Sequence, residues 1–106
     1  MSVQHVVLFS FPSDLNGDDW TEMRRQVRAW PEEIGGMTSL RFGPSINTDR
    51  ARGYQYLLYM EFPDELALTT YQQHPVHQVF LHWIIEHECT PLVFDYYLDE
   101  STVIAC

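Results

Sequence analysis

Two histidines and a tyrosine carry the chemistry that this sequence offers. In the stretch Tyr71-Gln72-Gln73-His74-Pro75-Val76-His77, Tyr71 stands six residues before His77, and His5 lies in the first apolar run of the chain. A neutral imidazole, with an ordinary pKa of about 6.5, can accept a proton at physiological pH. A phenol can donate a hydrogen bond to an oxygen on which charge develops. We therefore predict that His77, Tyr71 and His5 are catalytic, abstracting a proton beside a carbonyl group before an aldol or ring-closing step.

The residues around this trio predict a break between two helices. Pro75 suits the first turn of a helix, which makes His74 either its cap or, alternatively, a residue of the site. His77 shares a helical stripe with Phe80, and we expect Phe80 and His74 to contact a ligand. Tyr71 reaches the same cleft only if the two helices continue with no more than a kink, and His5 would then lie on the cleft floor.

Metal and cofactor signals are weak. His82 and Glu86 are four residues apart, a spacing that suits zinc, but a third ligand is not evident and an exposed polar face explains the pair equally well. No glycine-rich phosphate loop is present. We expect no metal site and no cofactor, and we expect Cys89 and Cys106 to be free thiols rather than a disulfide.

Length and charge restrict the class of protein. A chain of 106 residues predicts one domain, with residues 99–106 as a weakly determined tail. Fifteen acids against six arginines give a net charge of −9, which disfavours a nucleic acid partner. No apolar run is long enough to span a bilayer, and the N-terminus has no basic region of a secretory signal. These features suggest a cytoplasmic protein with no membrane partner.

Hydrophobic periodicity predicts six elements. Strands are expected at residues 4–11, 37–42, 54–62 and 91–97, with a polar loop at 45–52. A first helix is expected to be capped by Asp18 or Asp19 and to end or distort near Trp30, because Pro31 disfavours the helical conformation before it. A second helix opens at residues 63–65 and is broken at residues 74–75; its last part carries an apolar stripe of Val76, Val79, Phe80, Trp83 and Ile84. The order β-α-β-β-α-β predicts a ferredoxin-like α+β fold with a four-stranded antiparallel sheet.

Three of the four strands are apolar on both faces. A sheet of this plan carries its helices on one face only, and the chain has no further helix to cover the other. We therefore expect a second copy to pack against it, sheet to sheet, as a homodimer.

Several of these stretches together resemble the stress-responsive dimeric α/β-barrel (Dabb) family. The matching stretches run from residues 4–9 through 34–37, 42–43, 53–54 and 71–77 to 94–96. The resemblance implies a ferredoxin-like monomer whose sheet closes into a dimeric α+β barrel with that of its partner. The family includes a plant polyketide cyclase, whose catalytic pair falls on Tyr71 and His77 and whose pocket histidine falls on His5. Two other pocket positions of that cyclase, a histidine and a tyrosine, are Tyr56 and Val27 here, and we assign both to ligand binding.

Three functions remain open at this point. The first is an acid–base catalyst of the cyclase or lyase type, with a small apolar pocket for a small carbonyl compound. The second is a non-catalytic stress-responsive or ligand-binding homo-oligomer. The third is a cofactor-independent monooxygenase, which rests on fold analogy alone.

Overall fold

The structure is a computed structural model that describes residues 1–105. Its elements follow the predicted order, with the second helix divided into two. They are β1 (Ser2–Ser10), α1 (Gly17–Glu33), β2 (Ser39–Pro44), β3 (Tyr56–Phe62), α2 (Glu65–Gln73), α3 (Pro75–Glu86) and β4 (Thr90–Leu98). Cys89 is a free thiol, whereas the expectation for Cys106 lies outside the described residues.

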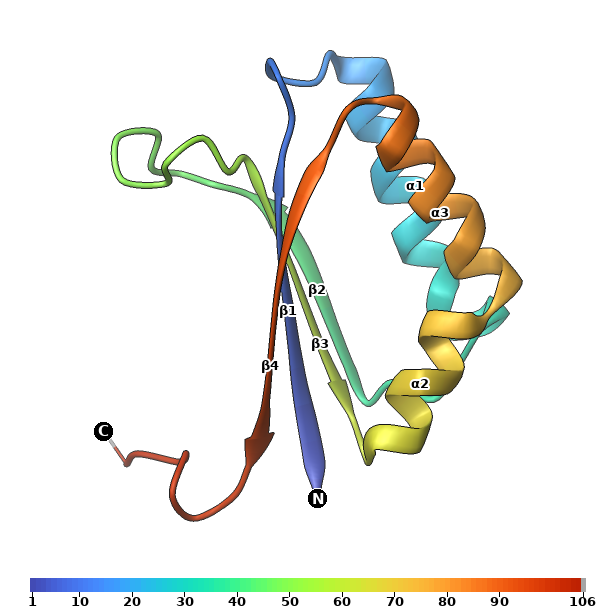
Figure 1. The fold of residues 1–106 in the computed structure, drawn as a ribbon, viewed down its shortest axis with the longest axis vertical. Helices are drawn as coiled ribbons and strands as arrows, with labels where there is room; N and C mark the ends of the chain where they lie inside the picture. The colour runs from blue at the N-terminus through green and yellow to red at the C-terminus, as the bar shows by residue number, and fades with distance from the viewer. Residues whose placement is uncertain (106) are drawn as a thin grey trace.

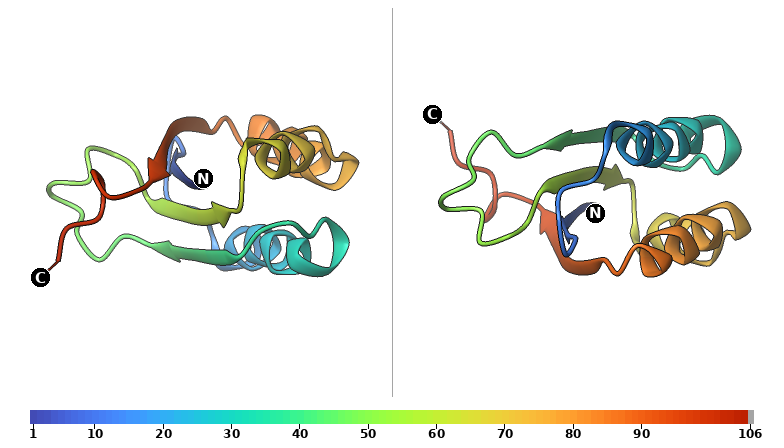
Figure 2. Two further views of the ribbon diagram at one scale, coloured as in Figure 1. Left: turned by 90° about the horizontal axis from the view of Figure 1, so that it is seen from below. Right: turned by 90° about the horizontal axis from the view of Figure 1, so that it is seen from above.

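The four strands form one antiparallel sheet in the order β2-β3-β1-β4. All three helices lie against the same face of this sheet, and the opposite face carries none (Figures 1 and 2). The predicted ferredoxin-like α+β fold is therefore confirmed. In the register of the sheet, His5 of β1 lies between Met60 of β3 and Asp95 of β4.

The hydrophobic core fills the space between the helices and the sheet. On β3, Leu58, Met60 and Phe62 are fully buried, while Leu57, the residue before Leu58, is exposed, as the alternation of the strand requires. Trp30 of α1 is the largest fully buried side chain, and its ring packs edge-on against Phe80 of α3. The first helix and the third are thereby joined to each other as well as to the sheet.

Helix α1 differs from the prediction at both ends. Its cap is Asn16, whose side-chain oxygen accepts a hydrogen bond from the Asp19 amide at 2.8 Å, so the expected Asp18 or Asp19 cap was wrong. The helix also continues through Pro31 to Glu33 instead of ending near Trp30. Pro31 has no amide to donate, but the Ile34 and Gly35 amides both donate to the Trp30 oxygen, at 2.8 and 3.0 Å, and close the last turn. The turn then closes at Gly35, which has a φ of 74°.

The break between α2 and α3 falls where it was predicted. His74 has an extended conformation, and its Nδ1 accepts a hydrogen bond from the Val76 amide at 3.1 Å, so His74 caps α3. One detail of the α3 stripe was wrong: Val79 is 62% exposed. The buried face of α3 instead consists of His77, Phe80 and Ile84.

The face of the sheet without helices is apolar and open. The exposed side chains on this face include Leu57 of β3 and Leu92, Phe94 and Tyr96 of β4, and Phe94 is 65% exposed. The loop between β2 and β3 and the segment after β4 both project from this side of the molecule (Figure 1). Within residues 1–105, no helix is long and apolar enough to cross a membrane.

Candidate functional site

The three predicted catalytic side chains meet at one place between the sheet and the helices. His5 comes from β1, Tyr71 from the end of α2 and His77 from the first turn of α3. The ring centroids of Tyr71 and His77 are 4.3 Å apart, and those of His5 and Tyr71 are 5.9 Å apart. The helix is interrupted at His74, but the interruption leaves the side chains of Tyr71 and His77 next to each other.

These three residues line a cavity of about 120 Å³. Its remaining walls are apolar, apart from Gln72, and are formed by Val7, Phe9, Leu58, Phe80, Leu81, Ile84, Pro91 and Val93. Behind it, the ring of Trp30 packs edge-on against both Tyr71 and His77 and holds them in place. An apolar cavity of about 150 Å³ accommodates benzene. The space here therefore fits a molecule of roughly six non-hydrogen atoms, with polar groups at one end.

His77 is held as a neutral base. Its Nδ1 lies 3.1 Å from the backbone oxygen of Gln72, and because a carbonyl oxygen only accepts, Nδ1 carries the proton. Nε2 is then the nitrogen with a lone pair. Burial lowers the pKa of His77 below its ordinary value of 6.5; the bond to Gln72 opposes this shift, and the neighbouring His5 adds to it. The site therefore favours an imidazole that can take up a proton.

His5 is oriented by a carboxylate. Its Nδ1 lies 2.5 Å from Oδ1 of Asp95, its neighbour on β4 in the sheet register. Since a carboxylate accepts, His5 donates from Nδ1, and its free nitrogen is again Nε2. Asp95 was not predicted as a site residue, although it is the one acid within the apolar run of β4, and that position was the available signal.

Tyr71 presents a protonated hydroxyl. The residue is 1% exposed, and within residues 1–105 no group accepts a hydrogen bond from its hydroxyl. Burial raises its pKa far above the ordinary value of 10.0, so the phenol does not ionise under physiological conditions. The hydroxyl is available as a hydrogen-bond donor to a molecule in the cavity.

The residues expected to contact a ligand are placed differently from one another. Phe80 lines the cavity. Val27 is buried in the hydrophobic core, His74 caps α3, and neither lines the cavity. Tyr56 lies at the other end of the sheet, where its ring stacks on Trp20 with centroids 4.6 Å apart.

Other titratable groups form no second centre of the same kind. Within residues 1–105, no three histidine, cysteine, aspartate or glutamate side chains are grouped so that they could hold a metal ion. His87 pairs with Asp19 at 3.5 Å near the ends of α3 and α1. Burial raises the pKa of Cys89 to about 11, so its thiol stays protonated.

The fold and the site together define a ferredoxin-like α+β protein with a small, mostly apolar cavity lined by two histidines and a tyrosine. A family model described as the stress responsive A/B barrel domain (Dabb) matches residues 3–98. The chain belongs to this family. No curated protein matches the sequence.

Solved structures share the fold at low identity. A dimeric protein of unknown function with a ferredoxin-like fold from Bacteroides fragilis has a TM-score of 0.79 and 22% identity, over 92% of this chain and 96% of that one. A Dabb family protein from Mesorhizobium loti has a TM-score of 0.72 and 23% identity, over 92% and 96%. A hydroxynitrile lyase from Passiflora edulis has a TM-score of 0.81 and 17% identity, over 93% and 94%. At such identities the likeness is one of fold.

Proposed function

We propose that this protein is a lyase that breaks or forms a carbon–carbon bond beside the carbonyl carbon of a small molecule, by proton transfer. The observation that carries the proposal is the convergence of Tyr71, His77 and the His5–Asp95 pair on one apolar cavity. Both imidazoles use Nδ1 for a fixed partner and keep Nε2 for a substrate. The type reaction is the cleavage of an α-hydroxynitrile, which needs a base for the hydroxyl proton and an acid for the leaving cyanide.

The step balances with the groups of the site. Nε2 of His77 takes the hydroxyl proton, the electron pair of the O–H bond forms the carbonyl, and the bond between the carbinol carbon and the nitrile breaks. The electron pair of that bond leaves with cyanide. Cyanide then takes that proton from the His77 imidazolium, which returns His77 to its neutral form. The Tyr71 hydroxyl donates a hydrogen bond to the substrate oxygen throughout.

Cavity size selects the substrate class. A space of about 120 Å³ is smaller than a polyketide chain and suits an aliphatic hydroxynitrile or aldol of a few carbons. A small substrate that fills the apolar cavity also excludes water from it, and charge–dipole interactions are stronger away from water. A hydroxynitrile lyase has a similar fold, and this likeness supports a lyase reaction on a small substrate.

We also infer that the protein is a homodimer in which the helix-free faces of two sheets meet. Support comes from the apolar side chains exposed on that face and from structural neighbours described as dimeric. A dimer of this kind leaves the cavity between the sheet and the helices of each protomer. The catalytic proposal does not depend on it.

A non-catalytic ligand-binding role is the second candidate. The observation that favours it is the depth of the trio, since His5, Tyr71 and His77 are 4%, 1% and 9% exposed. Such a site can hold a small carbonyl compound by hydrogen bonds without turning it over.

One experiment separates the two. Acetone cyanohydrin is incubated with the purified protein at mildly acidic pH, where its spontaneous decay is slow, and released cyanide is measured. We expect release above the protein-free rate, its loss in His77→Gln, and its retention in His82→Gln, an exposed histidine on the same helix. Release that persists in a folded His77→Gln variant ends the catalytic assignment. Absence of release by the wild type, together with acetone shifting the nuclear magnetic resonances of Val7 and Ile84, assigns ligand binding.

A further inference from the structure

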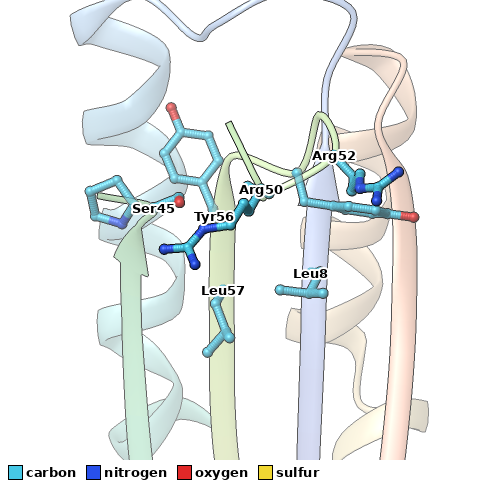
Figure 3. A pocket seen from close by; sticks show the side chains of 9 residues that line it. Leu8, Ser45, Arg50, Arg52, Tyr56 and Leu57 are labelled. Atoms are coloured by element: carbon cyan, nitrogen blue, oxygen red, sulfur yellow. The ribbon is translucent and has the colours of Figure 1, made fainter. Parts of the chain in front are cut away.

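A hollow of about 510 Å³ lies on the helix-free face of the sheet, under the loop that joins β2 to β3. Leu8 and Leu57 form its floor, and Arg50 and Arg52 extend from the loop above them (Figure 3). The homodimer inferred above covers this floor with the partner's sheet. In that dimer the hollow belongs to the subunit contact and offers no open site for a small ligand.

The break between α2 and α3 makes one backbone oxygen available to His77. In an unbroken helix each amide donates to the oxygen four residues before it, so the Val76 amide would donate to Gln72. Pro75 disfavours this arrangement, because it drives the residue before it out of the helical conformation, and His74 is extended with a ψ of 136°. The Val76 amide donates to Nδ1 of His74 at 3.1 Å. The His74 side chain thus takes the donor that a continuous helix would direct to the Gln72 oxygen.

The Gln72 oxygen accepts two side-chain donors from α3. Nδ1 of His77 lies 3.1 Å from it, and Nε2 of Gln78 donates to it at 2.8 Å. A carbonyl oxygen has two lone pairs, which these two donors fill. If the Val76 amide returned to this oxygen, it would compete with both. The bond to His77 is the longer of the two and therefore the one more readily lost.

This hydrogen bond decides which nitrogen of His77 keeps a lone pair for the cavity. While Nδ1 donates to Gln72, Nε2 has the lone pair and can accept a proton. If Nδ1 lost its acceptor, the proton could move to Nε2, and the ring would offer the cavity a donor instead of a base. His77 is 9% exposed, so bulk water replaces a lost acceptor poorly. The tautomer of His77 therefore depends on the Gln72 oxygen.

We propose that His74 is a positioning residue for His77: by capping α3 it keeps the Val76 amide away from the Gln72 oxygen, and so holds His77 as the tautomer with its proton on Nδ1. His74 does not line the cavity, so it acts through Val76 and Gln72 rather than by contact with a ligand. The effect on the tautomer concerns the protein alone, whereas its consequence for the rate rests on the lyase function proposed above.

The test reads the tautomer of His77 in the purified protein by nitrogen-15 nuclear magnetic resonance at about pH 7.5, where this imidazole is neutral. Its signals are identified by their loss in His77→Gln. We expect a proton on Nδ1 in the wild type and a shift of the proton toward Nε2 in His74→Ala. His74→Gly removes the same acceptor at a smaller cost in helix stability, and the same shift is expected. In both variants kcat for cyanide release should fall by about two- to tenfold, the effect of one net hydrogen bond, with KM little changed.

Two control variants separate this role from a general loss of stability. His74→Asn supplies another side-chain oxygen that caps a helix well, so it should keep the wild-type tautomer and a kcat within about twofold. Asp64→Ala removes the corresponding cap of α2, whose side chain accepts from the Ala67 amide at 2.8 Å, and it should leave the tautomer of His77 unchanged.

An unchanged tautomer in His74→Ala and His74→Gly overturns the proposal, and so does an equal shift in His74→Asn or in Asp64→Ala. A wild type that releases no cyanide ends the lyase function, while the tautomer measurement still decides the role of His74. A shifted tautomer with an unchanged kcat supports the positioning of His77 and refutes its part in turnover.

Discussion

Replacing Tyr71 with phenylalanine tests the proposed catalytic role of its hydroxyl separately from its role in folding. The hydroxyl has no acceptor within residues 1–105 and the residue is 1% exposed, whereas the ring packs against Phe62, Trp30 and His77. Phenylalanine keeps those ring contacts, and removing a hydroxyl that borders the cavity breaks no internal hydrogen bond of the described residues. We expect the free energy of unfolding to stay level or rise by up to about 1 kcal/mol, which is up to roughly 4–8 °C in Tm for a domain of this size.

Turnover should move in the opposite direction. Loss of a hydrogen bond to a developing negative charge lowers kcat by about 10²–10³-fold. Urea unfolding followed by tryptophan fluorescence gives the stability, and cyanide release from acetone cyanohydrin gives the rate. The expected result is a protein at least as stable as the wild type that has lost its activity.

Tyr59→Phe is the control for this pair of measurements. The Tyr59 hydroxyl donates to the side-chain oxygen of Gln4, a residue that is 3% exposed, so its removal leaves a buried acceptor without that donor. We expect this change to cost about 1 kcal/mol of stability and to leave turnover intact. If Tyr71→Phe loses as much stability as Tyr59→Phe and keeps its turnover, the Tyr71 hydroxyl is structural and the reasoning is refuted.

Four further outcomes follow from the same structure. Because burial, with a further contribution from His5, lowers the pKa of His77 below 6.5, the acid limb of the pH–rate profile should lie below pH 6.5. The stability linked to neutral His77 should be complete above pH 6.5 and decline as the pH falls toward the lowered folded-state pKa; urea titrations at several pH values should show this decline in the wild type and a smaller one in His77→Gln. Phe94→Glu should convert a dimer to monomers in light scattering, whereas Ile85→Glu, at a site 68% exposed on α3, should not; an unchanged mass for Phe94→Glu would count against sheet-to-sheet pairing. Val93→Ala removes two methyl groups from the wall of the 120 Å³ cavity at a residue that is 51% exposed, so we expect less than about 1 kcal/mol of destabilisation and a shift of cyanide release from acetone cyanohydrin toward the larger mandelonitrile. An unchanged ratio of the two rates would show that Val93 does not limit the substrate.

The order of elements was predictable because the hydrophobic periods are strong and the breaks are chemically distinct. On β3 the apolar alternation leaves only one choice of buried face, and Pro75 after His74 divides the helical region where the structure divides it. The ends of α1 were harder to predict from the sequence. Three neighbouring side chains can cap a helix here: Asn16, Asp18 and Asp19. Which of them becomes the cap depends on the conformation of the preceding loop.

The site was predictable only in part, since its members come from four elements. Tyr71 and His77 are close in sequence, so a helix break sufficed to bring them together. The pairing of His5 with Asp95 joins residues 90 positions apart and depends on the register of β1 and β4, which sequence alone does not give. Tyr56 is opposite Phe9 in the register, four residues along β1 from His5, which is about 13 Å at the rise of a strand. Its ring instead stacks on Trp20 of α1, and Tyr56 does not line the cavity.

The different partners of the two imidazoles suggest a division of labour. The Gln72 carbonyl that holds His77 carries no net charge, and the surroundings of His77 favour the neutral ring. The Asp95 carboxylate that holds His5 can balance a full positive charge on that ring. Under the proposed function, His77 is therefore the group that receives the proton, and Asp95 fixes the orientation of the His5 ring.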